Sequence, residues 1–185
     1  MATTPFLRNK YWVLRHGKSI PNEKGLIVSS LENGTRREYQ LASEGVDQAR
    51  LAGELFLKVM EDLRERFFGP SFELLSHDKY PEIWALDEKD PFMRPEGGES
   101  VNDVVSRLAT AMAAMELEFQ GCAILVVSHG DPLQILQTLL NAVKQVTEPN
   151  CDNLASRIET VRVHNILSQH RKNALLTGEL RSVVQ

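Results

Sequence analysis

The sequence contains few cysteines, no long apolar run and no excess of positive charge. Its 185 residues include two cysteines, Cys122 and Cys151, whose spacing matches neither a disulfide framework nor a metal site. We expect Cys122, which opens an apolar run, to be a buried thiol, and Cys151 to lie in a loop. No run is long enough to span a bilayer, and the first residues lack the apolar core of a signal peptide. These absences predict a protein of a reducing, cytoplasmic compartment.

Charge and length limit the number of domains and the classes of partner that we expect. The net charge is −4, with 42% hydrophobic and 25% charged residues, a composition that is ordinary for a globular protein. An acidic balance provides no long-range field to attract nucleic acid or an anionic membrane. A chain of 185 residues suits one domain with a real core. We therefore expect a single domain over residues 1–185, with neither nucleic acid nor membrane as partner; the oligomeric state is open.

The first motif stands at the end of a short apolar run near the start of the chain. This Tyr-Trp-Val-Leu run predicts a buried strand that ends at Arg15, His16 and Gly17. Ligands bind at the carboxyl ends of strands in open α/β sheets. Gly17 permits a close approach of the backbone to a ligand, while Ser19 and Asn22 offer neutral hydrogen-bond donors. The pattern predicts a phosphate cradle around a nucleophile; a polar loop with a surface histidine is the alternative.

A second block repeats this arrangement later in the chain. A wholly apolar run after residue 121 predicts a central parallel strand, and it ends in His129 and Gly130. Asp131 then suits the N-cap of a helix that has Pro132 at its first position. A lone histidine after a strand is more often structural. Two parallel strands that each end in histidine predict a pair of site residues at one edge of the sheet.

The pattern Arg15-His16-Gly17-x-Ser19-x-x-Asn22 resembles the signature of the histidine phosphatase superfamily, the phosphoglycerate mutase-like proteins. The resemblance implies an α/β fold in which helices flank a mainly parallel central sheet. It also implies a small phosphorylated substrate, and neither a metal nor another cofactor.

The same resemblance assigns roles to individual residues. It implies that His16 attacks phosphorus to form a phosphohistidine, and that Arg15 and His129 bind the phosphoryl group. Further substrate contacts are implied at Ser19, Asn22 and Gly130. A segment that reads Leu-Arg-Glu-Arg-Phe-Phe-Gly resembles the part of the family that carries the proton donor, which places that role at Glu65. Burial can raise the pKa of a carboxyl enough for this role; a charged helix end with Glu65 in a surface salt bridge is the alternative.

The stretch between these motifs departs from the family pattern. Apolar residues recur at helical spacing after Ser43, a sound N-cap, so we expect one helix that continues to residue 66. The residues expected to face the core are Ala49, Ala52, Leu55, Phe56, Val59, Met60 and Leu63. The strand–helix unit that usually follows, with a second phosphate-binding arginine, is missing here. The candidates to replace this arginine are Arg64, Arg66 and Arg94, and no motif selects one.

Other segments carry weaker signals. Residues 69–98 are rich in proline, aromatic and charged residues, which predicts an insertion or lid. Ser100 and Asp103 predict a capped helix start. Residues 158–163 and 180–184 hint at strands. Residues 23–40 read as a polar loop, and the Arg36-Arg37 pair within it is more often solvated than bound to substrate.

These observations lead to a functional hypothesis with open alternatives. The preferred activity is hydrolysis of a phosphomonoester through a phosphohistidine on His16. Phosphoryl transfer of the mutase type is one alternative, and a catalytically impaired family member acting as a binding protein is another. A shortened chain whose folding is impaired is a third, because loss of a strand leaves backbone groups unpaired.

Overall fold

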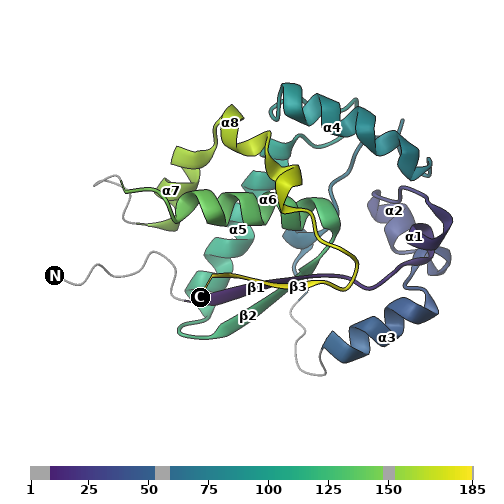
Figure 1. Ribbon diagram of the computed structural model, residues 1–185, viewed down its shortest axis with the longest axis horizontal. Helices are drawn as coiled ribbons and strands as arrows, with labels where there is room; N and C mark the ends of the chain where they lie inside the picture. Colours follow the sequence, from purple (N-terminus) through teal and green to yellow (C-terminus); the bar gives the residue numbers. More distant parts are fainter. Residues whose placement is uncertain (1–8, 53–58, 148–152, 185) are drawn as a thin grey trace.

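A computed structural model of the chain describes residues 9–52, 59–147 and 153–184. Within these residues a three-stranded sheet lies at the centre of an α/β fold (Figure 1). β1 (Lys10–Arg15) is the middle strand, parallel to β2 (Ala123–Ser128) and antiparallel to β3 (Leu180–Val184). The predicted α/β fold and the predicted strand near the end of the chain are confirmed. The small sheet has one parallel and one antiparallel pair.

β2 is an edge strand, so the prediction of a central strand is wrong. Val126 is buried, but the side of β2 that carries Val127 is partly open, and Val127 is 47% exposed. Among the described residues no strand pairs with the outer edge of β2. An apolar run is typical of a strand covered on both faces, but it does not reveal which neighbours are present. The open edge is consistent with a missing strand–helix unit.

Two long helices cover one face of the sheet. α5 (Val101–Glu118) and α6 (Gly130–Val143) pack against each other above the strands (Figure 1). The predicted capped start of α5 is confirmed, because Ser100 and Asp103 form a reciprocal capping box. Buried residues of both helices and of β1 and β2 form the main core, among them Val13, Val104, Leu108, Met112, Val126, Ile135 and Leu139.

The outer side of α6 is covered by shorter helices. α7 (Leu154–Val161) and α8 (His164–Leu167) contact α6, and a 3₁₀ turn, η4 (His170–Asn173), follows them. The strand expected over residues 158–163 is therefore wrong. A spacing of three between apolar residues fits a helical face as well as it fits an irregular strand, and Ile158 is buried on such a face.

Short helical turns connect β1 to the next full helix. They are α1 (Ile20–Lys24), α2 (Leu31–Gly34) and the 3₁₀ turn η1 (Arg37–Tyr39), so the stretch expected to be an irregular loop is partly helical. α3 (Ser43–Ala52) follows and lies beside the carboxyl end of the sheet (Figure 1).

The segment after α3 does not continue the helix to residue 66 as predicted. Glu61–Leu63 forms a 3₁₀ turn, η2, and Arg64 is extended. Val59, expected in the core, is 88% exposed, whereas Met60 and Leu63 do pack against the core. Leu55 and Phe56 lie outside the described residues. Apolar spacing suggested one helix, but Leu63 lies beside the sheet, where its carbonyl accepts a hydrogen bond from the Ser128 hydroxyl.

Residues 69–98 contain a regular element. A 3₁₀ turn, η3 (His77–Lys79), leads into α4 (Tyr80–Lys89). Ile83 of α4 is buried in a small second cluster with Ile27 and Phe68. This packing fixes one face of α4 on the protein, and the role of the segment as a lid stays a prediction.

Two expectations based on composition have different outcomes. Cys122 is exposed, so the prediction of a buried thiol is wrong. It follows Gly121, whose φ of +67° turns the chain just before β2 begins. Cys151 lies outside the described residues. No helix within residues 9–52, 59–147 and 153–184 has the length and apolar character needed to cross a membrane.

Candidate active site

The pairing of β1 with β2 brings two histidines to the same edge of the sheet. Arg15 stands opposite Ser128 in the register, so both strands end together and a histidine follows each. The His16 amide donates a 3.0 Å hydrogen bond to the Ser128 carbonyl. The two imidazole rings meet edge to face, with centroids 4.6 Å apart and an angle of 69° between planes. The structure thus joins the two sequence motifs into one site.

The ring of His16 is held in one orientation. Its Nδ1 lies 2.7 Å from the Gly17 carbonyl oxygen. A carbonyl only accepts hydrogen bonds, so Nδ1 carries the proton and Nε2 keeps its lone pair. Burial, with a contribution from the Arg15 charge, lowers the pKa of His16. A neutral imidazole with a free Nε2 is the form that can act as a nucleophile.

Glu65 lies beside the second histidine. One Glu65 oxygen accepts a 2.9 Å hydrogen bond from the Arg66 amide, and the other is 3.6 Å from His129 Nδ1. Burial, aided by the negative charge of Asp131, raises the pKa of Glu65 to about 8. Burial lowers the pKa of His129, and the positive charge of Arg15 adds to this effect. A protonated carboxyl and a neutral imidazole therefore stand together near neutral pH.

Arg15 extends along the start of α6. Its Nη1 donates a 3.2 Å hydrogen bond to the Leu175 carbonyl. Its Nε is buried and has no hydrogen-bond partner among the described residues. The guanidinium lies against Gly130, because a Cβ built on that glycine would be 3.6 Å from Arg15 Nε. A buried donor without a partner is unfavourable unless a ligand satisfies it.

Ser19 and Asn22 stabilise the start of α1, and their contact with substrate stays a prediction. They form a reciprocal capping box at the start of α1, with each side-chain oxygen accepting from the backbone amide of the other. Their oxygens are therefore engaged by α1, while the Ser19 hydroxyl proton and the Asn22 amide protons stay available as donors.

Gly17 has a different neighbour from the one that the sequence suggested. A Cβ on Gly17 would lie 2.3 Å from the Gly45 carbonyl oxygen, and a Cβ on Gly45 would lie 2.0 Å from the Lys18 carbonyl oxygen. The two glycines therefore allow the backbone of the nucleophile loop to touch the first turn of α3. In this structure the close approach that Gly17 permits is to the helix.

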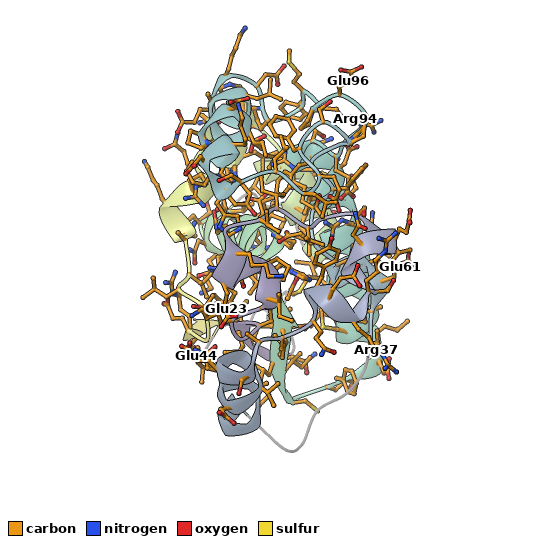
Figure 2. All side chains as sticks on the ribbon, turned by 90° about the vertical axis from the view of Figure 1, so that its right-hand side faces the viewer. Glu23, Arg37, Glu44, Glu61, Arg94 and Glu96 are labelled. Carbon is orange, nitrogen blue, oxygen red and sulfur yellow. The ribbon has the colours of Figure 1, made fainter. Side chains whose placement is uncertain are left out.

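The three candidate replacements for the second arginine are all paired with carboxylates. Arg64 bonds Glu99 at 2.8 Å, and Arg94 is an exposed partner of Asp103. Figure 2 shows Arg94 at the outer margin of the molecule, as it also shows Arg37, and Arg37 is exposed. Arg66 is fully buried. None of these residues presents an unpaired guanidinium to the histidines.

A buried ionic cluster supports the site, and sequence reasoning missed it. Arg66 forms a two-pronged pair with Asp87, with both contacts at 2.8 Å, and reaches Asp131 at 3.1 Å. His170 Nε2 lies 3.4 Å from Asp131. Burial opposes protonation of His170, but the close carboxylate of Asp131 outweighs it and raises the pKa of His170. The cluster joins the Glu65 loop, α4, α6 and η4.

The place of Asp131 in this cluster corrects the prediction that it caps α6. The helix starts at Gly130 and His129 occupies the N-cap position. Asp131 points instead to Arg66 and His170, which hold its pKa below the usual range although burial acts the other way. The position of Asp131, two residues after His129, indicated that it lies near the site. Its partners could not be predicted because they lie far away in sequence.

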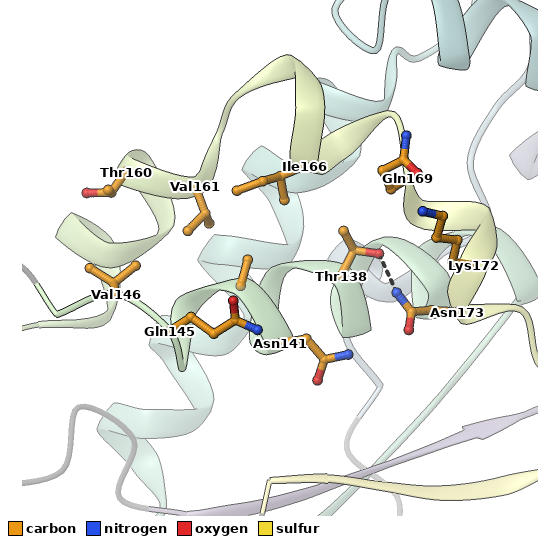
Figure 3. A pocket seen from close by; sticks show the side chains of 11 residues that line it. Thr138, Asn141, Gln145, Val146, Thr160, Val161, Ile166, Gln169, Lys172 and Asn173 are labelled. Atoms are coloured by element: carbon orange, nitrogen blue, oxygen red, sulfur yellow. Dashed lines mark hydrogen bonds between the residues drawn. The ribbon is translucent and has the colours of Figure 1, made fainter.

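A separate pocket of about 540 Å³ lies between α6 and the α7–η4 segment (Figure 3). It begins at Thr138, more than two helical turns after the site histidine, and its lining contains amides, hydroxyls and small apolar groups. Figure 3 shows the Thr138 hydroxyl bonded to Asn173 at its rim. No histidine or carboxylate lines it, so it is distinct from the site at the strand ends.

Comparison with known proteins agrees with this geometry. The family profile of the Histidine phosphatase superfamily (branch 1) matches residues 55–165, which include Glu65 and His129. The bifunctional protein Rv2228c of Mycobacterium tuberculosis is 32% identical over 120 residues, 63% of this chain. That match covers 32% of the relative, so the chain spans about a third of the length of the curated relatives that it matches.

Solved structures share the fold at low sequence identity. A mycobacterial glucosyl-3-phosphoglycerate phosphatase in complex with VO3 superimposes with a TM-score of 0.66 at 18% identity, covering 92% of this chain and 88% of that one. The product of the open reading frame Rv3214 from Mycobacterium tuberculosis gives 0.60 at 21% identity, covering 93% and 89%. The profile match over more than half of the residues, on a fold shared with phosphatases, shows that this chain belongs to the histidine phosphatase superfamily.

Proposed function

We propose that this protein hydrolyses a small phosphomonoester through a phosphohistidine on His16. The observation that carries the proposal is the fixed orientation of the His16 ring, whose Nε2 keeps a lone pair beside His129. A named phosphatase among the structural neighbours, solved with VO3, supports the same class of reaction. Arg15, His129 and the donors of Ser19 and Asn22 would hold the phosphoryl oxygens, because phosphoryl transfer depends chiefly on positioning and charge.

In the first step, His16 Nε2 attacks phosphorus and the bond from phosphorus to the leaving oxygen breaks. The proton on Glu65 passes to that oxygen, so an alcohol leaves instead of an alkoxide. In the second step, water attacks phosphorus and the phosphorus–nitrogen bond breaks. The Glu65 carboxylate takes the proton from water, which restores the starting protonation state and releases inorganic phosphate.

Transfer to an alcohol in place of water would make the protein a mutase. The site residues are the same for both reactions, so the nature of the acceptor distinguishes them. A binding protein without turnover is the remaining candidate, and it predicts ligand binding without a phosphoenzyme.

The test is to incubate the chain and its His16→Ala variant with a panel of phosphomonoesters and to measure phosphate release. A short incubation is quenched with alkaline detergent and kept above neutral pH, because the phosphorus–nitrogen bond of phosphohistidine is labile in acid. Mass spectrometry then looks for about 80 Da added at His16, the mass of a phosphoryl group. We expect release and the adduct in the natural chain and neither in the variant. Release that persists in a folded His16→Ala protein would refute the proposal, and absence of both signals in the folded natural chain would favour the binding protein.

A further inference from the structure

Arg171 is a half-buried arginine for which the described part of the chain provides no carboxylate within ion-pair distance. It lies in η4, with its guanidinium 3.8 Å from the centre of the Trp84 ring. Its Nη1 donates a 2.9 Å hydrogen bond to Gln134 Oε1. By contrast, the buried Arg66 and Arg107 each have a carboxylate partner. A partly desolvated cation without a counter-ion is unfavourable, and an anionic ligand would supply the missing charge.

This guanidinium lies on the same edge of the protein as the nucleophile loop. A Cβ built on Gly130 would be 3.7 Å from both the Arg15 guanidinium carbon and Gln134 Nε2. Gln134 therefore stands between the two arginines, because its other amide atom holds Arg171. Burial lowers the pKa of Arg171 and the positive charge of Arg15 adds to this effect, while the negative charge of Asp131 opposes it. Arg171 thus lies next to the phosphoryl site but is separated from it by a side chain.

The aromatic support under Arg171 is itself held in place. Trp84 stacks on Tyr80 with ring centroids 5.6 Å apart and planes within 3°, and Tyr80 packs edge to face on Phe68. Phe68 follows Glu65 by three residues, so the aromatic group lies against the segment that carries the proposed donor. Burial, with the negative charges of Glu65 and Asp131, also raises the pKa of Tyr80. A planar guanidinium stacked on a fixed ring loses little entropy when it binds an anion.

We propose that Arg171 binds an anionic group on the leaving-group side of the substrate. The phosphomonoesters that the site prefers then carry a second negative charge, a carboxylate or another phosphate. The transferred phosphoryl group lies with Arg15 and the two histidines, and the second anion lies beyond Gln134 on the Trp84 ring. This inference rests on the proposed function, which identifies the bound phosphomonoester as a substrate. The binding of the second anion does not depend on turnover.

The experiment measures binding of two phosphonates that cannot be hydrolysed, benzylphosphonate and 4-carboxybenzylphosphonate, by titration calorimetry at low salt. The carboxylate should make the second probe bind about tenfold more tightly to the natural chain, as expected for a charge-assisted hydrogen bond at a partly exposed site. Arg171→Met keeps much of the side-chain volume but removes the charge, and it should reduce this preference to about onefold. Lys172→Ala removes the exposed cation next in sequence and should leave the preference intact.

Equal affinity of the natural chain for the two probes would overturn the proposal, as would a preference that survives in folded Arg171→Met protein. Failure of 4-carboxybenzylphosphonate to bind would also overturn it. Loss of affinity for both probes by the same factor would place Arg171 at the phosphoryl group instead. Because no bond is broken in this assay, a protein without phosphatase activity can still show the preference, so the proposed function and this inference fail separately.

Discussion

The buried carboxyl of Glu65 gives a prediction about stability that requires no knowledge of the substrate. The side chain is 17% exposed, and burial with the charge of Asp131 raises its pKa from 4.5 to about 8. Such a change corresponds to about 5 kcal/mol for ionising the group in the folded protein. Because the folded-state pKa is the higher one, the folded chain binds more protons than the unfolded chain between these values. Glu65 therefore reduces stability progressively as pH rises from about 4.5 to about 8.

Glu65→Gln removes this titration while it keeps the shape and the hydrogen bond from the Arg66 amide. We expect the variant to be close to the natural chain in stability at pH 5 and more stable by about 3 kcal/mol at pH 7. Urea denaturation of both proteins at pH 5, 7 and 9 measures the difference, with equal m values as the check for two-state unfolding. Parallel stability curves over this pH range would refute the assignment of a high pKa to Glu65.

Ionisation of the Glu65 carboxyl should also reduce activity at alkaline pH. Glu65 can donate a proton only while it holds one, so release of an alkyl alcohol should fall as pH rises through about 8. Glu65→Gln should slow hydrolysis of an alkyl phosphate by about 10²–10⁴-fold. It should slow the first step much less with 4-nitrophenyl phosphate, because nitrophenolate leaves without protonation. Equal losses with both substrates would contradict a role as general acid.

Three further changes test the packing around the site. Asp87→Ala removes the partner of a fully buried arginine and should cost about 3–5 kcal/mol in urea denaturation, whereas Arg94→Ala at an exposed pair should cost less than about 1 kcal/mol; similar losses would contradict the argument. Gly45→Ala places a Cβ 2.0 Å from a backbone oxygen and should lower both stability and activity, while Gly34→Ala meets no atom within 4 Å and serves as the control. Val127 is 47% exposed on the open edge strand, so Val127→Lys should change stability by less than about 0.5 kcal/mol in urea denaturation; a larger loss would show that this side of the strand is covered.

The sequence was sufficient for the parts of the site that depend on strand ends. Apolar runs that stop at a histidine predicted two strands, and parallel pairing then brought His16 and His129 together. The segment with Glu65 was found by its resemblance to the family, and the structure places it 3.6 Å from His129. These features are local in sequence or follow directly from strand pairing, so no knowledge of the rest of the fold was needed.

Features that depend on contacts between distant segments could not be predicted in the same way. Arg66 meets Asp87 and Asp131, which are 21 and 65 residues away, and no periodicity selects such partners. The spacing of Ile158 and Val161 fits a helix as well as a broken strand. Tertiary packing against α6 favours the helix. The prediction of a helix that reaches residue 66 was wrong because hydrophobic spacing does not reveal the change to extended backbone at Arg64.

The distant contacts contribute to the raised pKa of Glu65 on which its proposed role as a proton donor depends. Asp131 is kept ionised by Arg66 and His170, and its negative charge then adds to burial in holding the proton on Glu65. A neutral residue at position 131 would remove this contribution and would also leave two cations of the cluster with fewer partners. Arg66 follows Glu65 directly in the chain, so the contact that anchors the loop also keeps Asp131 charged. Residues of α4, α6 and η4 that the linear motif does not contain thus add to burial in raising the pKa of the proposed donor.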